Sequence, residues 1–353
     1  MSRALLFAVS VALLGAIAFA SPTPDRVTDR GVYEATAAMR IVPDCSDLHC
    51  FRALVPWIIG VVPGASTGAW KAYAAICNAL SGVAVLALAP LLGLSSRVAW
   101  FAAIASTIGF GSLYTLHDPY TSDPLMFAIA PVILGAGLAG RIRWAAALAA
   151  VGVVAKEFAA APLYLVAAYD AVGRRWRDAC RAIAGANVAL IVWLALTLWL
   201  MLAFNYSWGA TDSANFGGGA GIGPWLQRQS ARGIAAAMFN EFGALWLLAP
   251  AGFLRAGRTL RTLALVALPF AAIFCYVQQP DRALWNFHFL ATPLAALALE
   301  PAPLALAVAT LVAFGVGNLR VGAQLPIGGL GRAALAASVL LAVCDLWFVA
   351  RKA

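Results

Sequence analysis

Carboxylate side chains with the spacing of a catalytic pair occur near the start of the chain. The polar segment 21–52 contains Asp25 and Asp29, each followed directly by an arginine. Positions four apart share one face of a helix, so both carboxylates are expected to point into one cavity. A carboxylate in partly dry surroundings suits proton abstraction, which makes these two residues candidate general bases. A solvated loop with local ion pairs is the alternative.

Arginine, lysine and histidine follow in separate segments that suit anion or sugar binding. Arg52 is a candidate contact for a lipid phosphate, although an arginine that only extends to the membrane interface has the same pattern. Lys156 and Glu157 lie together in an apolar stretch, which is costly unless they pair or face a water-filled cavity. Lys156 suits a phosphate-bearing lipid, and a self-contained Lys–Glu pair is the alternative. The segment QQPDRALWNFH adds Arg282 and His288 to a mixed polar rim.

A second acidic segment, HDPYTSDP, presents His117, Asp118 and Asp123. Two carboxylates and an imidazole can hold a divalent cation or bind sugar hydroxyls, so a divalent cation stays open as a cofactor and no cofactor is required. The alternative is a purely structural role, in which the two Asp-Pro pairs form turns that end helices. Cys45 and Cys50 predict a local disulfide if this loop faces an oxidising compartment. A metal site from these cysteines lacks a nearby fourth ligand.

The elements that position these residues must be membrane helices. The 353 residues are 63% hydrophobic and only 11% charged, with a formal net charge of +9. Soluble domains are nearer one quarter charged. The arginines lie between apolar runs, where they set orientation, and motifs for nucleic-acid binding are lacking. The composition therefore predicts an all-α, multi-pass transmembrane bundle with no nucleic-acid partner.

Four basic clusters fix the expected orientation, because short loops rich in arginine face the cytoplasm. The clusters are Arg141/Arg143, Arg174/Arg175/Arg177/Arg181, Arg255/Arg258/Arg261 and Arg351/Lys352. The apolar runs are 72–94, 98–116, 125–139, 182–205, 233–253, 262–277, 287–299, 304–318 and 333–349. Residues 144–170 form a short hairpin with Lys156 and Glu157 at its tip. Residues 4–20 form a retained first helix or a signal peptide cleaved before Ser21. The total is about twelve spans, with a range of roughly 10–13, both termini inside and the polar segments outside.

Several of these segments resemble the GT-C superfamily of membrane glycosyltransferases, which take sugars from polyprenyl-phosphate donors. TDRGVYEATA, with Asp29 and Tyr33, is similar to the acidic first outer loop of that family, and FRALVPW resembles an Arg-x-Leu-x-Pro segment. HDPYTSDP resembles its second acidic loop, and VVAKEFAAAPL a lysine-containing hairpin. The resemblance implies that Asp29 is the catalytic base and Lys156 and Arg282 contact phosphate. It also implies that Asp118 or Asp123 is a second-loop acid.

These observations together predict one transmembrane domain over residues 1–353. Residues 1–170 would form a GT-C-like catalytic core, and residues 171–353 the C-terminal membrane helices. The expected activity is transfer of a sugar from a polyprenyl-phosphate-linked donor to an acceptor outside the cytoplasm. The expected location is a bacterial inner membrane, with the site on the periplasmic face. A non-catalytic assembly protein, or a transporter or flippase of lipid-linked or small polar substrates, is the alternative.

Overall fold

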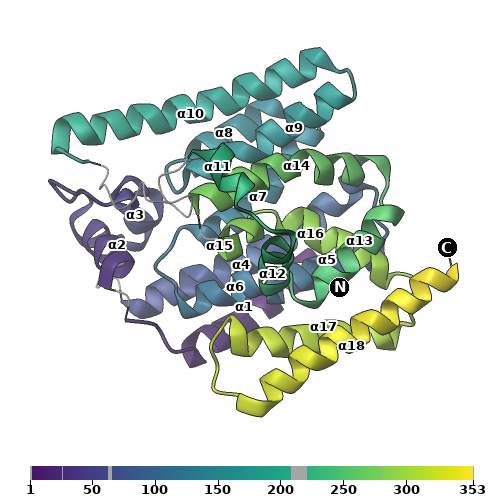
Figure 1. The fold of residues 1–353 in the computed structure, drawn as a ribbon. Coiled ribbons are helices and arrows are strands. Elements are labelled where there is room, and N and C mark those ends of the chain that lie inside the picture. Colours follow the sequence, from purple (N-terminus) through teal and green to yellow (C-terminus); the bar gives the residue numbers. More distant parts are fainter. Residues whose placement is uncertain (1, 26, 63–65, 208–220, 279, 353) are drawn as a thin grey trace.

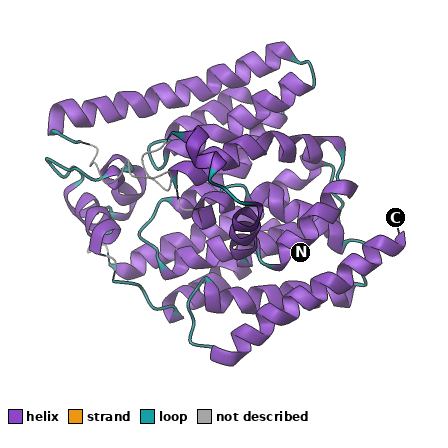
Figure 2. Cartoon of the chain, in the orientation of Figure 1, coloured by secondary structure: helices purple, strands orange, loops and turns teal. Residues whose placement is uncertain are grey.

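The computed structural model describes residues 2–25, 27–62, 66–207, 221–278 and 280–352. Within these ranges the chain is helical with connecting loops, and no strand is present (Figure 2). The predicted all-α bundle is therefore confirmed. The longer helices fall on the predicted apolar runs, whereas the helices Val27–Met39, Leu54–Ile59, Ile222–Gln227 and Pro280–Trp285 lie outside them. An apolar run in an apolar environment satisfies its backbone hydrogen bonds as a helix.

The N-terminal half contains a long first helix, a polar segment and then a series of packed helices. Its α-helices are α1 (Arg3–Ala20), α2 (Val27–Met39), α3 (Leu54–Ile59), α4 (Thr67–Leu88), α5 (Ser96–Ile108), α6 (Phe110–His117), α7 (Asp123–Leu138), α8 (Ile142–Gly152) and α9 (Ala161–Val172). Three short 3-10 helices join them: η1 (Leu48–Phe51), η2 (Ala89–Leu92) and η3 (Glu157–Ala160).

The C-terminal half begins with the longest helix and ends with a packed helix pair. Its helices are α10 (Trp176–Phe204), α11 (Ile222–Gln227), α12 (Ala231–Phe242), α13 (Ala244–Arg255), α14 (Arg258–Val277), α15 (Pro280–Trp285), α16 (His288–Leu299), α17 (Leu304–Val321) and α18 (Gly328–Lys352). Helices α10 and α18 lie on opposite edges of the bundle in Figure 1.

Seven helical stretches of the described chain are long and apolar enough to cross a membrane. They are Arg3–Ala20, Thr67–Leu92, Ser96–His117, Trp176–Phe204, Arg258–Val277, Leu304–Val321 and Gly328–Arg351. Helices α12 and α13 pass the same test only together, with a bend of 103° between them. The bend lies at Gly243, whose φ of +52° is readily adopted by glycine. Large apolar side chains face outward, such as Leu202 at 86% exposure, as expected of a lipid-facing surface.

Polar contacts between loops show which helix ends lie at the same end of the bundle. Ser95, before α5, donates a hydrogen bond of 2.6 Å to Glu300, which follows α16. The guanidinium of Arg97 donates to the carbonyl of Ala302 at 2.7 Å in the same region. At the other end, Lys71 near the start of α4 donates to the carbonyl of Ser21 after α1, at 2.7 Å. These contacts place the start of α4 beside the end of α1, and the start of α5 beside the end of α16.

The stretch 144–170 forms a helical hairpin, as predicted. Helix α8 ends at Gly152, whose carbonyl accepts a hydrogen bond of 2.9 Å from the Lys156 N–H. A Cβ at position 152 would lie 2.7 Å from the Cβ of Ala159, so only glycine permits this close approach. The hairpin packs beside α7 and α10 and places Lys156 and Glu157 at its tip.

Candidate functional site

The segment after α1, which contains α2, η1 and α3, is fixed to the end of α10 and to the tip of the hairpin. The N–H of Ser207, just after α10, donates to the carbonyl of Cys45 at 3.0 Å. The N–H of Leu54 donates to the carbonyl of Val154 at 3.2 Å. In Figure 1, α2 and α3 accordingly lie at the left end of the bundle, where α10 ends. This placement brings together polar segments that are more than 100 residues apart in sequence.

A disulfide between Cys45 and Cys50 closes the part of this loop that holds His49. Asp47 begins η1 and accepts a 2.8 Å hydrogen bond from the His49 N–H, while its Oδ1 lies 2.7 Å from His49 Nδ1. Burial favours the neutral form of Asp47, but the bonds from His49 outweigh it and lower the pKa of this carboxyl. The disulfide loop therefore holds the imidazole in a fixed place.

Helix α2 presents Asp29 and Tyr33 to this imidazole. Asp29 Oδ1 lies 3.8 Å from His49 Nδ1, and the Tyr33 ring centroid is 5.7 Å from that of His49. Tyr33 is 1% exposed, and its hydroxyl is 3.4 Å from the Ser122 hydroxyl in the second acidic segment. Asp29 and Tyr33 lie one helical turn apart, so one face of α2 contacts both His49 and the segment HDPYTSDP.

Arg52 and Glu157 form a bidentate ion pair, which links the polar segment 21–52 to the tip of the hairpin. Arg52 Nη2 donates to Glu157 Oε1 at 2.7 Å, and Arg52 Nε donates to Oε2 at 3.2 Å. Burial disfavours the charged guanidinium, but the Glu157 carboxylate more than compensates and raises the pKa of Arg52. The Asp123 carboxylate also favours the charged form of this guanidinium.

Lys156 pairs with Asp123 of the segment HDPYTSDP and not with Glu157, its neighbour in sequence. Its Nζ donates to Asp123 Oδ1 and, at 3.3 Å, to Gln278 Oε1 after α14. The side chains of Lys156 and Asp123 are 1% and 2% exposed, so both charges are removed from solvent. Isolated charges at such depth are costly, which makes the pairing obligatory. The self-contained Lys156–Glu157 pair considered from the sequence is replaced by two cross-segment pairs.

Aromatic side chains form the wall behind the ion pairs. Trp70 is fully buried and packs against Tyr33, Tyr73 and Tyr120, with ring centroids 5.1–6.3 Å apart. The Tyr120 hydroxyl donates to Glu34 at 2.9 Å. Aromatic rings beside polar groups are well suited to stacking on a sugar ring while its hydroxyls are hydrogen-bonded.

Two of the predicted acids lie away from this cluster or at its edge. The Asp25 side chain is 94% exposed, and among the described residues it pairs with Arg30 at 3.9 Å. The predicted shared face with Asp29 is wrong, because α2 begins at Val27 and Pro24 precedes it, so Asp25 lies before the helix. Asp118 ends α6, is 6% exposed and donates its backbone N–H to the Tyr114 carbonyl.

The basic residues His117 and His288, both predicted to belong to the site, are not brought together by the described structure. His117 Nδ1 bonds to the Pro22 carbonyl, close to the end of α1. The side chain of Arg282 lies outside the described residues. His288 lies inside the bundle: its Nδ1–H donates to the Trp285 carbonyl at 2.9 Å, and its Nε2 accepts from Ser81 at 2.9 Å. The expectation of an outer position for His288 is wrong: its side chain is fully buried, and its partner Ser81 lies in the interior of α4.

His49, Asp47 and Gln278 are members of the cluster that the sequence did not single out as site residues. His49 lies between two cysteines, and the disulfide loop that positions it was the only signal available. Gln278 belongs to a polar segment that was noticed, but its partner Lys156 is 122 residues away and no local pattern reveals that contact.

The disulfide gives a direct test of the oxidising environment. Mass spectrometry of unreduced peptides from protein purified without reductant is expected to show Cys45 and Cys50 joined. The same sample should contain alkylated Cys180, an exposed free thiol, as an internal control. Alkylation of both Cys45 and Cys50 in that sample would show that this loop does not face an oxidising compartment.

The described residues contain no group of three or more His, Cys, Asp and Glu side chains that is arranged to hold a metal ion. What the cluster offers is a carboxylate beside an imidazole, two buried cations held by carboxylates, and an aromatic wall. Such a set can accept a proton, bind an anion and orient a polar substrate. No protein-family model, no curated protein and no solved structure matches this chain.

Proposed function

We propose that this protein is a membrane glycosyltransferase of the GT-C type, which moves a sugar from a polyprenyl-phosphate donor to an acceptor hydroxyl. The main support is the convergence of Asp29, Arg52 and Lys156 at one end of the bundle. Their contacts link the first outer loop, the second acidic segment and the hairpin tip. A transporter places its polar residues near the membrane midplane instead.

In the proposed reaction, Asp29 accepts the proton of the acceptor hydroxyl. The resulting oxygen attacks the anomeric carbon of the donor sugar, and the bond from that carbon to the phosphate oxygen breaks. The electron pair of this bond stays on the phosphate, where Arg52 and Lys156 stabilise the developing charge. Both cations are already paired, with Glu157 and Asp123, so donor binding replaces a carboxylate by a phosphate at each cation.

An apolar cavity of about 230 Å³ supports a lipid-linked donor. It lies among α13, α14 and α16 and is lined by side chains such as Met238, Trp246 and Phe287. Stacked rings lead from it toward the ion pairs: Phe287 is 5.1 Å from Phe274, which is 4.0 Å from Phe158, and Lys156 Nζ is 5.3 Å from the Phe158 ring. In the proposal the prenyl chain occupies this cavity and its phosphate lies beyond the rings.

The proposed topology has about twelve crossings, with the α8–α9 hairpin counted as two and both termini in the cytoplasm. The shorter apolar helices Asp123–Leu138, Ile142–Gly152 and His288–Leu299, together with α9 and the bent pair, supplement the seven long ones. The site then faces the periplasm of a bacterial inner membrane. This orientation agrees with the inner position of the arginine-rich loops.

Cysteine labelling tests this topology. In a Cys180→Ser/Cys344→Ser background, Gln229→Cys is expected to react with an impermeant maleimide in intact cells. Gly257→Cys is expected to react only after the membrane is opened. Both positions are exposed in the structure, so burial does not prevent labelling. The reverse pattern would place Asp29 and Lys156 on the cytoplasmic side and contradict the proposed site.

The activity itself is tested with purified protein in proteoliposomes. Polyprenyl-phosphate-linked sugars are supplied as donors, with the corresponding nucleotide sugars as a matched control. Product is expected from the lipid-linked donors alone, because the proposed site lies on the periplasmic face. Movement of a lipid-linked or small polar substrate across the membrane without transfer would instead favour a flippase or transporter.

A further inference from the structure

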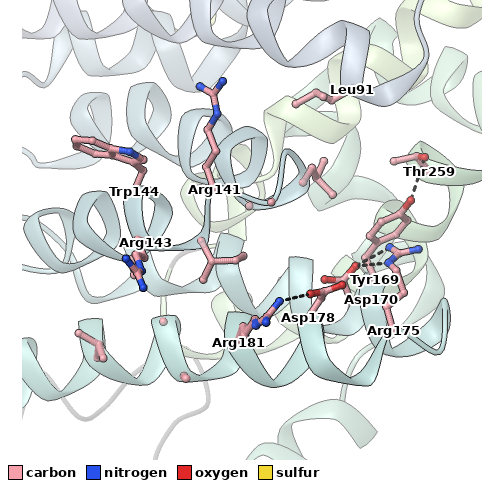
Figure 3. Close-up of a pocket in the computed structure, with 18 residues that line it drawn as sticks. Leu91, Arg141, Arg143, Trp144, Tyr169, Asp170, Arg175, Asp178, Arg181 and Thr259 are labelled. Carbon is pink, nitrogen blue, oxygen red and sulfur yellow. Dashed lines mark hydrogen bonds and ion pairs between the residues drawn. The ribbon is translucent and has the colours of Figure 1, made fainter.

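A polar cavity, far from the cluster described above, opens at the other end of the bundle. Its volume is about 990 Å³, and it lies where α7 ends and α8 and α10 begin. Four arginines line it, at positions 141, 143, 175 and 181, together with Asp170 and Asp178. Figure 3 shows these side chains around the opening between the helices.

Half of this positive charge is neutralised within the protein. Arg175 bonds to Asp170 at 2.6 Å and lies 4.8 Å above the Tyr169 ring, and Arg181 bonds to Asp178 at 3.0 Å. Among the described residues, neither Arg141 nor Arg143 bonds to a protein group through its guanidinium, and Figure 3 shows both extending away from the two pairs. The cavity therefore has a net charge of about +2 available to a ligand.

The helix ends add to this positive field. Helices α8 and α10 both begin at the cavity, with Arg141 and Arg175 as their N-cap residues, and neither side chain caps the free backbone N–H groups. Uncapped helix N-termini carry partial positive charge and N–H donors that favour anions. Two such termini and two arginines without protein partners thus face one space.

The surroundings of the cavity are those of a membrane interface. Trp144 and Trp176, at the starts of the same two helices, are 71% and 63% exposed. Exposed tryptophans at the ends of membrane helices are typical of contact with lipid headgroups. Ala184 and Val188 of α10 line the cavity, and Ile191, on the same face one turn further, is 64% exposed. An apolar strip therefore leads from the cavity along the outside of α10.

We propose that this cavity binds the headgroup of an anionic phospholipid of the inner leaflet, with the acyl chains along α10. Charge complementarity supports a phosphate-bearing ligand, and the continuous apolar strip supports a lipid as its source. A diphosphate headgroup such as that of cardiolipin matches the net charge best. The proposal is independent of the transferase activity, because the cavity lies at the opposite end of the bundle from Asp29.

Native mass spectrometry of detergent-purified protein tests this site by titration with cardiolipin, phosphatidylglycerol and phosphatidylcholine. Wild type is expected to retain cardiolipin most and phosphatidylcholine least. The Arg141→Gln/Arg143→Gln variant is expected to bind cardiolipin roughly 30-fold more weakly, from the usual contribution of two basic residues. Arg255→Gln/Arg351→Gln removes the same charge from the same side but outside the cavity, and should bind as wild type does.

If both double variants bound cardiolipin equally weakly, the proposal would be wrong, because binding would then depend on general surface charge and not on this cavity. Inorganic pyrophosphate is the soluble probe: if it displaces cardiolipin at comparable concentration, the source of the ligand is not a lipid. A photoactivatable cardiolipin tests wild type directly, should the glutamine variant fail to fold. Crosslinks are expected in peptides covering 141–146 and 176–191, and crosslinks confined to other helices would contradict the proposal.

Discussion

Replacing Asp29 with asparagine is expected to reduce sugar transfer by about 10²- to 10⁴-fold, the usual loss when a general base is removed. Asparagine keeps the volume of the side chain and some hydrogen bonding, but it cannot accept the acceptor's proton. Asp29 Oδ1 lies 3.8 Å from Nδ1 of the His49 imidazole, which Asp47 holds in place, and Asp29 is on the helix face that also presents Tyr33. The loss should appear in kcat, with the KM for the donor nearly unchanged.

Asp25→Asn is the matched control, since it removes the same charge from the same loop. Its side chain is 94% exposed, so only a small effect on transfer is expected. Expression level and elution in detergent show whether each variant is folded. Normal turnover by Asp29→Asn would exclude it as the base. If Asp25→Asn alone were inactive, the role would pass to a residue that the structure places outside the cluster.

The placement of the helices could be predicted because it depends on local patterns. Apolar runs define the helices, whereas the orientation inferred from the arginine-rich loops stays a prediction. The hairpin was predicted from the rule that arginine-rich loops lie on one side of the membrane. Both ends of 144–170 are basic, so the chain must turn back within this stretch. Its charged tip, Lys156 and Glu157, was located correctly for that reason.

The pairing of charges could not be predicted, because it depends on contacts between distant segments. Arg52 and Glu157 are 105 residues apart, and Lys156 and Asp123 are 33 residues apart. Composition shows that buried charges need partners, but not which partners they take. The depth of His288 was missed for a similar reason, since its hydrogen-bond partner Ser81 is 207 residues away in sequence. The transferase activity stays a prediction.

Lys156→Met is expected to have two separable effects, on stability and on donor binding. Removal of the ammonium leaves the Asp123 carboxylate buried without its cation, and breaking a buried pair in this way typically costs about 3–5 kcal/mol. Methionine fills most of the space of the lysine stem, so loss of packing contributes little. Thermal unfolding in detergent measures the first effect. The second is a higher KM for the polyprenyl-phosphate donor, because a phosphate contact present throughout the reaction has been lost.

The double variant Lys156→Met/Asp123→Asn separates these effects. With both charges removed, most of the lost stability should return, because replacing both members of a buried pair is often nearly neutral. The KM for the donor should stay high, since the phosphate still lacks its cation. A double variant with both the stability and the donor KM of wild type would show that Lys156 only neutralises Asp123. The phosphate-binding role would then fall to Arg52, whose guanidinium bonds to Glu157 at the same end of the hairpin.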